Sequence, residues 1–235
     1  MNKKVKEQKN MKKIILALLS IMVSLFTAGC GNNSNMISTT TDTQIHSEHQ
    51  KAADGESKVL ITYFTVPEAD GTDTSAGASR VADNGEVYGN TQYIAQLIQK
   101  AAGGDLFEIK TVQDYPDTHK PLLDFAYNEL RDDARPELES KIENLDDYDV
   151  IFVGYPNWNA DLPMPLYSFF EEYDFSGKTI IPFVTHGGSG FSSTVKKIAE
   201  LEPNADVFSD GLSVSRNNVA KAKDEVNIWV KSLGF

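Results

Sequence analysis

Four short apolar runs constrain the fold more than any other feature of this sequence. They are residues 58–64 (KVLITYF), 105–110 (DLFEIK), 148–154 (YDVIFVG) and 178–184 (KTIIPFV). The third and fourth are nearly continuous in Val, Ile and Phe, which is typical of strands covered on both faces of a parallel sheet. Segments with helical periodicity follow the runs. The sequence therefore predicts an α/β fold.

The order of these segments predicts a particular topology. Residues 205–214 supply a weaker fifth strand, and residues 216–233 a closing amphipathic helix. Strands that alternate with helices are joined by right-handed crossovers, which predicts a three-layer, doubly wound, five-stranded parallel sheet. We expect the strand order 2-1-3-4-5, with a ligand crevice between the first and third strands, at their carboxyl ends.

The first 29 residues have the pattern of a secretory signal peptide. Two lysines precede an apolar run at residues 14–26, and small residues follow it. This run is short for a membrane-spanning helix. We therefore expect residues 1–29 to be removed, with both Met1 and Met11 open as the start.

Cys30 is the only cysteine, which excludes an intrachain disulfide and a cysteine metal cluster. Its place directly after Ala28-Gly29 resembles the lipobox of bacterial lipoproteins, although Thr27 stands where that family usually has Leu. The resemblance implies a lipid on Cys30 and an extracytoplasmic location on the bacterial cell membrane. A cysteine that merely follows an ordinary cleavage site is the alternative.

Two polar segments are expected to lack a packed core. Residues 30–57 are rich in Asn, Ser, Thr and Asp, and we interpret them as a flexible tether before a domain at residues 58–235. His46 and His49 lie in this tether, where no metal site is expected. Residues 66–87 form an insertion that is small, acidic and without helical or strand period.

The charge of the expected mature chain is strongly acidic. Six of the 22 basic residues and one of the 34 acidic residues fall within residues 1–29, which leaves 16 and 33 and a formal net charge of −17. This argues against nucleic acid or an anionic lipid surface as a partner. It is compatible with docking on a basic redox partner, and a solvated acidic face is the alternative.

The first strand leads to a candidate anion site. Thr65 follows the strand, and Gly89-Asn90-Thr91 opens the next helix. Unpaired N–H groups in a first helical turn, the helix dipole and nearby hydroxyls favour a phosphate at this place. The alternative is that Asn90 or Thr91 only caps the helix.

Two further loops end at the same edge of the predicted sheet. Tyr155-Pro156-Asn157-Trp158 offers an aromatic platform, with capping of the core by Trp158 as the alternative. Residues 185–190 (THGGSG) let the backbone approach a ligand closely. They do not match the Gly-x-Ser-x-Gly nucleophile elbow, which argues against a serine hydrolase. Tyr115 and His119 follow the second strand and could face the same crevice.

Together these motifs resemble the flavodoxin-like family, in particular a bacterial branch with a tyrosine-phenylalanine-hydroxyl, Gly-Asn-Thr, Gly-Tyr-Pro-x-Trp and Thr-x-Gly-Gly-Ser-Gly pattern. The resemblance covers residues 58–233 and implies FMN as the cofactor. The residues it assigns to the phosphate are Thr65, Gly89, Asn90 and Thr91. Those that would line the isoalloxazine are Pro156, Asn157 and, by stacking, Trp158, and Tyr155 is also assigned to the cofactor site. Those that would bind its pyrimidine side are Thr185, His186, Gly187, Gly188, Ser189 and Gly190, with His186 also a candidate modulator near N1.

The implied function is electron transfer, or FMN-dependent reduction of a small acceptor such as a quinone. Flavin N5 would be the reactive atom, no protein nucleophile or base is implied, and the redox donor and acceptor are unidentified. A lipoprotein that binds another ligand on the same scaffold, without flavin chemistry, is the alternative. In the family the hydroxyl residue and Gly-Asn-Thr form one tight loop, whereas residues 66–87 separate them here. The phosphate site therefore depends on how the insertion folds.

Overall fold

The computed structural model describes residues 58–69 and 80–235 of the chain. The predicted signal peptide, the lipid on Cys30 and the tether lie outside the described residues, as does the middle of the insertion. Within the described ranges, no helix is both long enough and apolar enough to cross a membrane.

The centre of the fold is a parallel sheet with the predicted strand order. Its strands are β1 (Val59–Tyr63), β4 (Asp105–Glu108), β5 (Val150–Pro156), β6 (Thr179–His186), β7 (Asp206–Val207) and β8 (Leu212–Ser215). The order is β4-β1-β5-β6, and β6 pairs with both β7 and β8. Because β7 and β8 together occupy the fifth place, the predicted order 2-1-3-4-5 is confirmed.

The fifth strand is split because β6 contains a proline. Phe208 N–H donates to the carbonyl of Ile180 at 2.8 Å, which ends the pairing with β7. Pro182, two residues further along β6, faces the same side of the strand but has no N–H to donate. Pairing resumes only at Phe183, opposite Leu212 of β8. The sheet therefore has six strands where five were predicted.

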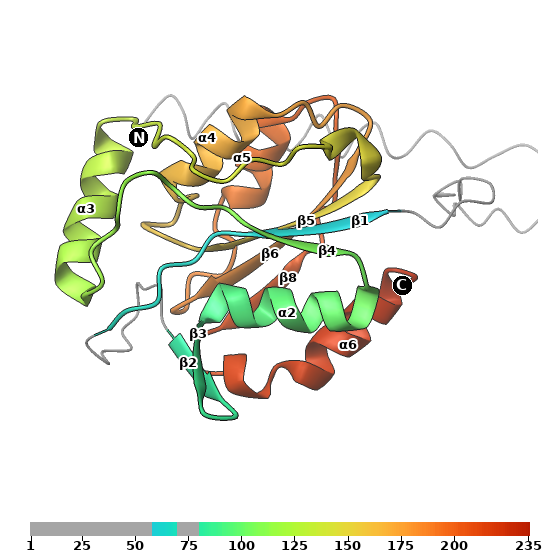
Figure 1. Ribbon diagram of the computed structural model, residues 1–235, viewed down its shortest axis with the longest axis horizontal. Coiled ribbons are helices and arrows are strands. Elements are labelled where there is room, and N and C mark those ends of the chain that lie inside the picture. Colours follow the sequence, from blue (N-terminus) through green and yellow to red (C-terminus); the bar gives the residue numbers. More distant parts are fainter. Residues whose placement is uncertain (1–57, 70–79) are drawn as a thin grey trace, which may run out of the picture. The chain divides into compact units, whose positions relative to one another are not determined.

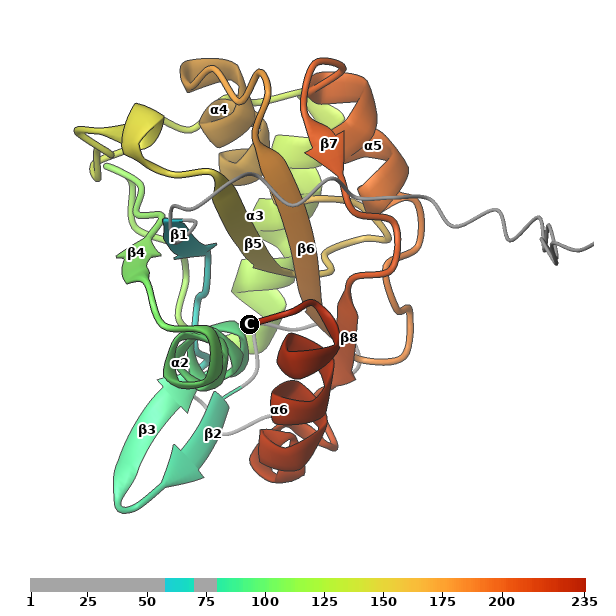
Figure 2. The ribbon, with the colours of Figure 1, turned by 90° about the vertical axis from the view of Figure 1, so that its right-hand side faces the viewer.

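Two layers of helices cover the sheet (Figures 1 and 2). Helices α2 (Asn90–Ala102) and α6 (Lys223–Ser232) lie on one face, below the sheet in Figure 1. Helices α3 (His119–Arg131), α4 (Met164–Glu172) and α5 (Thr194–Leu201) pack against the other face. Short 3-10 turns are η1 (Leu145–Asp147) and η2 (Val219–Lys221). The three-layer architecture is confirmed.

Alternate residues of β5 face the two helical layers, as the two-sided burial predicted. Ile151 and Val153 join the core cluster under α4, whereas Phe152 joins the cluster under α2 and α6. The strand runs to Pro156, so Tyr155 and Pro156, which were expected in the loop after the apolar run 148–154, belong to the strand. A Cβ at Gly154 would overlap the ring of Phe183, its register partner on β6. Gly154 is therefore needed for the packing of β5 against β6.

The insertion contains a β-hairpin that the sequence analysis missed. Strands β2 (Arg80–Asp83) and β3 (Glu86–Gly89) pair antiparallel. They are joined by Asn84-Gly85, whose φ angles of 51° and 89° are both positive, as a two-residue hairpin turn of type I′ requires. The expectation of no regular structure in residues 66–87 is therefore wrong for the part beyond residue 79. The hairpin leads directly into α2.

Candidate functional site

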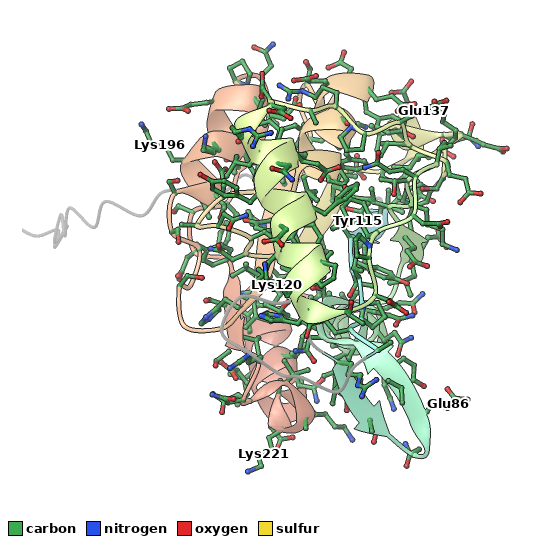
Figure 3. All side chains as sticks on the ribbon, turned by 90° about the vertical axis from the view of Figure 1, so that its left-hand side faces the viewer. Glu86, Tyr115, Lys120, Glu137, Lys196 and Lys221 are labelled. Atoms are coloured by element: carbon green, nitrogen blue, oxygen red, sulfur yellow. The ribbon has the colours of Figure 1, made fainter. Side chains whose placement is uncertain are left out.

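The candidate site is the edge of the sheet where β1, β5 and β6 end. Direct contacts join the segments at this edge. The hydroxyls of Thr91 in α2 and Thr185 in β6 are hydrogen-bonded at 2.8 Å, and Asn157 N–H, after β5, donates to the carbonyl of Thr185 at 2.9 Å. Figures 1 and 3 show α3 standing in front of this edge. The three predicted loops are thus neighbours in the fold.

The two halves of the predicted phosphate loop meet despite the insertion. Gly89, the last residue of the hairpin, lies so close to Thr65 that a Cβ on Gly89 would overlap the Thr65 hydroxyl. The hairpin therefore returns the chain to the place that it left at the end of β1. The insertion changes the route between Thr65 and Gly89 but not their contact.

The first turn of α2 has no cap from the side chain of its N-cap residue. Gly89 occupies that position, its own N–H donates to Gln92 Oε1 at 3.2 Å, and the turn contains no acidic residue. Asn90 is 3% exposed, and its Oδ1 has no hydrogen-bond partner among the described residues. The alternative that Asn90 or Thr91 caps the helix is therefore wrong. An anion at this helix start would face unpaired N–H groups and the positive end of the dipole.

Asn157 ties the loop after β5 to the loop after β6. Its Nδ2 donates to the carbonyl of Gly190 at 2.7 Å and to Ser192 Oγ at 3.2 Å. Asn157 is 5% exposed, and its Oδ1 has no partner within the described ranges. The side chain thus fixes the spacing of the two loops while one buried acceptor stays available for a ligand.

Trp158 is buried and does not form an open platform for a ligand ring. It is 4% exposed and contacts the rings of Phe64 and Tyr115, with centroids 5.4 Å and 5.6 Å away. The structure favours the alternative in which Trp158 caps the core. Stacking of a ligand ring on Trp158 stays a prediction.

Tyr155 requires a correction to the predicted site. Its side chain is fully buried, and its hydroxyl donates to Thr194 Oγ1 of α5 at 2.9 Å. This burial raises the pKa of the Tyr155 phenol well above its usual range. Since residues of β5 alternate between the two faces, Tyr155 points into the core and brings only its backbone to the edge. Pro156 is the last residue of the same strand and is also buried.

The loop after β6 holds His186 in one tautomer. The N–H of Gly188 donates to His186 Nδ1 at 2.9 Å, which leaves the proton of the neutral ring on Nε2. Burial lowers the pKa of His186, so the neutral form is favoured. Gly188 and Gly190 have φ angles of 141° and 57°, which favour glycine at both places. His186 can therefore act as a neutral hydrogen-bond donor, beside the predicted Gly187 and the exposed Ser189.

A network around Tyr115 joins α3 to this edge. The Tyr115 hydroxyl is within 2.9 Å and 2.8 Å of the two carboxyl oxygens of Glu129, and Gln113 Nε2 donates to the same carboxylate. Burial raises the pKa of Glu129. Figure 3 shows Tyr115 beside α3, on the side of the helix that faces the sheet. The Tyr115 ring contacts Trp158, which follows β5, and its place at a ligand crevice stays a prediction.

Glu68 and His119 form a pair whose acidic member the sequence analysis missed. His119 Nδ1 donates to Glu68 Oε1 at 2.9 Å, and Glu68 is only 2% exposed. No signal in the sequence distinguishes Glu68 from the other acidic residues of the insertion. His119, expected in a loop, is instead the first residue of α3.

Comparison with known proteins gives one consistent result. A family model described as flavodoxin matches residues 79–233. A curated flavodoxin of Picosynechococcus sp. (strain ATCC 27264 / PCC 7002 / PR-6) is 31% identical over 136 residues, which cover 56% of this chain and 58% of that relative. The match thus spans little more than half the length of that flavodoxin.

Solved structures extend the similarity to nearly the whole length of the neighbours. A candidate flavoprotein from Bacteroides uniformis ATCC 8492 is 27% identical with a TM-score of 0.58, covering 74% of this chain and 98% of that one. A flavoprotein from Lactobacillus acidophilus NCFM, solved in complex with FMN, is 19% identical with a TM-score of 0.50 over the same shares. The second likeness concerns the fold alone.

Proposed function

The chain belongs to the flavodoxin family, and from this membership we propose that it is a flavoprotein that binds FMN at the carboxyl ends of β1, β5 and β6. The observation that carries the proposal is the contact of Gly89 with Thr65. It brings together the two parts of the phosphate loop that the insertion separates in the sequence.

The residues at the start of α2 fit the phosphate of FMN. The first turn after Gly89 offers N–H donors, and the Thr65 hydroxyl lies against Gly89. A helix start of this kind binds phosphate without a cationic side chain. Thr91, whose hydroxyl is bonded to Thr185, would hold the adjoining loop in place.

The loops after β5 and β6 fit the polar side of an isoalloxazine. The buried Oδ1 of Asn157 is an acceptor without a partner among the described residues, and the imide N–H of a flavin is a donor. The loop of Gly188 and Gly190 allows backbone to approach the ring. His186 would hold a proton at Nε2 and offer it as a neutral donor.

When bound, FMN would supply one-electron and hydride chemistry at its ring. We propose electron transfer, or reduction of a small acceptor such as a quinone, as the activity. The net charge of −17 outside residues 1–29 supports exchange with a basic protein partner. The lipobox-like Cys30 supports a protein tethered outside the cytoplasmic membrane.

A second candidate is a ligand-binding lipoprotein without flavin chemistry. One observation favours it: Trp158 is 4% exposed and its neighbours are protein rings, so a flavin would have to displace them in order to stack on it.

The visible absorption spectrum of the purified full-length protein tests the proposal. We expect a flavin spectrum with quenched fluorescence after FMN is added and excess is removed by gel filtration. Trp158→Phe should weaken retention if the indole contacts the ring, whereas Trp229→Phe on α6 is the matched control and should not. A wild-type protein that retains no FMN at micromolar concentration would contradict the proposal and favour the second candidate.

A further inference from the structure

Glu68 is a buried carboxylate, and one of its oxygens has no hydrogen-bond partner among the described residues. It belongs to the insertion, outside the motifs that carry the family resemblance, and it is 2% exposed. Oε1 accepts a hydrogen bond from His119 Nδ1, whereas Oε2 is buried and has no partner among the described residues. A buried polar atom left unpaired is costly, so its presence in a folded protein calls for an explanation, and a ligand that completes the bonding is one.

The segment that carries Glu68 runs between the two ends of the proposed FMN site. It begins after Thr65, which lies against Gly89 at the phosphate end. It is fixed at Ala69, whose N–H donates to the carbonyl of Asp117, in the loop that follows Tyr115. The Tyr115 ring contacts Trp158 at the ring end. Glu68 therefore belongs to a segment that leads from the region proposed for the phosphate to the loop whose Tyr115 contacts Trp158.

The chemistry of the free oxygen limits what it can bind. A carboxylate oxygen accepts hydrogen bonds and suits a hydroxyl or N–H group, whereas a phosphate offers only acceptors when fully ionised. The part of FMN that joins the phosphate to the ring is the ribityl chain, a polyol whose hydroxyls are donors. The position of Glu68 and its bonding capacity thus agree on the same part of the ligand.

We propose that Glu68 is a binding residue whose Oε2 accepts a hydrogen bond from a ribityl hydroxyl of FMN. His119 is its positioning residue, since it holds Oε1 and so directs the second oxygen. The inference rests on the proposed function, and it assigns to the insertion a part of the binding site that the phosphate-loop motif does not contain.

Titration with three flavins distinguishes a contact of Glu68 with the ribityl chain from a contact with the phosphate and from a general loosening of the site. FMN has both polyol and phosphate, riboflavin has the polyol alone, and lumiflavin has neither. Each is titrated into the full-length apoprotein while the quenching of flavin fluorescence is measured. In Glu68→Gln an amide NH₂ replaces one acceptor oxygen, and we expect the affinities for FMN and riboflavin to fall about tenfold. The affinity for lumiflavin should stay within about twofold, which also shows that the variant is folded.

Further variants test whether the effect is specific to Glu68 and whether it depends on His119. Glu202→Gln changes a partly buried glutamate at the C-terminal end of α5, near the opposite edge of the sheet, and should leave all three affinities within about twofold. His119→Ala should reproduce the selective loss. His119→Asn should keep most of the wild-type affinity for FMN and riboflavin, because the amide nitrogen of Asn can take the place of Nδ1 as donor.

The possible results decide the proposal. Unchanged affinities for FMN and riboflavin in Glu68→Gln would overturn it, as would a parallel loss for lumiflavin, which indicates a general loosening of the site. A loss for FMN alone would assign Glu68 to the phosphate and overturn the ribityl role. If wild type binds none of the three flavins, the proposed function fails as well, whereas normal binding by wild type with an unchanged variant refutes this inference alone.

Discussion

Gly89 and Thr65 are in contact although residues 66–88 separate them, and the space for a Cβ at Gly89 is filled by the Thr65 hydroxyl. This contact joins the end of β1 to the start of α2. The φ of Gly89 is −66°, an angle that every residue type can adopt, so glycine is required here for space and not for backbone conformation.

Gly89→Ala should therefore impair phosphate binding selectively. The added methyl group has to displace Thr65, and overpacking of this kind costs about 1–3 kcal/mol. We expect FMN affinity to fall by about tenfold or more, and riboflavin affinity to change much less, in fluorescence titrations. Equal losses for the two flavins would show that Gly89 does not act at the phosphate.

Asn157→Asp should loosen the loop after β6. The substitution replaces the Nδ2 donor with a carboxylate oxygen that faces the carbonyl of Gly190, 2.7 Å away. We expect a loss of about 2 kcal/mol in the free energy of unfolding. Hydrogen exchange in residues 186–192 should also be faster. Ser192→Ala is the control, since it keeps the 2.7 Å bond to Gly190 and should cost less. It removes the 3.2 Å bond from Asn157 Nδ2 and the 3.2 Å bond that Ser192 Oγ donates to the carbonyl of Ser189.

The strands and their order could be predicted because burial on two faces leaves a continuous apolar signal along β5 and β6. The Asn84-Gly85 turn could also have been found, since this dipeptide is the strongest short-range hairpin signal. The split of the fifth strand has a local cause that the sequence contains, the proline at position 182. These features depend on neighbouring residues, which a sequence displays directly.

The less predictable features depend on residues that are distant in the sequence. Glu68 and His119 are 51 residues apart, and no pattern in either segment announces their pairing. The burial of Trp158 depends on Tyr115, which reaches it from the loop after β4 and is held there by Glu129. Aromatic residues in an edge loop predict a ring platform, but whether the platform is open is decided by such long-range packing.

Tyr155→Phe tests the correction to the predicted site. The variant keeps the buried ring and removes only the bond to Thr194 Oγ1, which still donates to the carbonyl of Phe191 at 2.6 Å. We expect a loss of about 1 kcal/mol in the free energy of unfolding, measured by chemical denaturation. FMN affinity should stay within about twofold of wild type. A large drop in affinity with unchanged stability would return the Tyr155 hydroxyl to the binding site.

His186 should make the apoprotein less stable in mild acid. Burial lowers the pKa of His186 below its ordinary value of 6.5, and protonation of Nδ1 would also break the bond from Gly188 N–H. The unfolded chain therefore binds a proton more readily than the folded one between the two pKa values. The contribution of the neutral ring is complete above about pH 6.5 and is lost as the pH falls through the folded-state pKa.

His186→Gln removes this titration, and the difference from wild type provides the measurement. The free energy of unfolding of both proteins is measured by chemical denaturation between about pH 5 and 8. Below about pH 6.5, wild type should lose stability relative to the variant. An NMR titration of the His186 ring should report a pKa below 6.5 and a proton on Nε2 in the neutral form. A pKa above 6.5 would mean that this edge of the sheet stabilises the cationic ring. His186 would then place a positive charge near a reduced flavin, which would contradict our inference of a neutral hydrogen-bond donor.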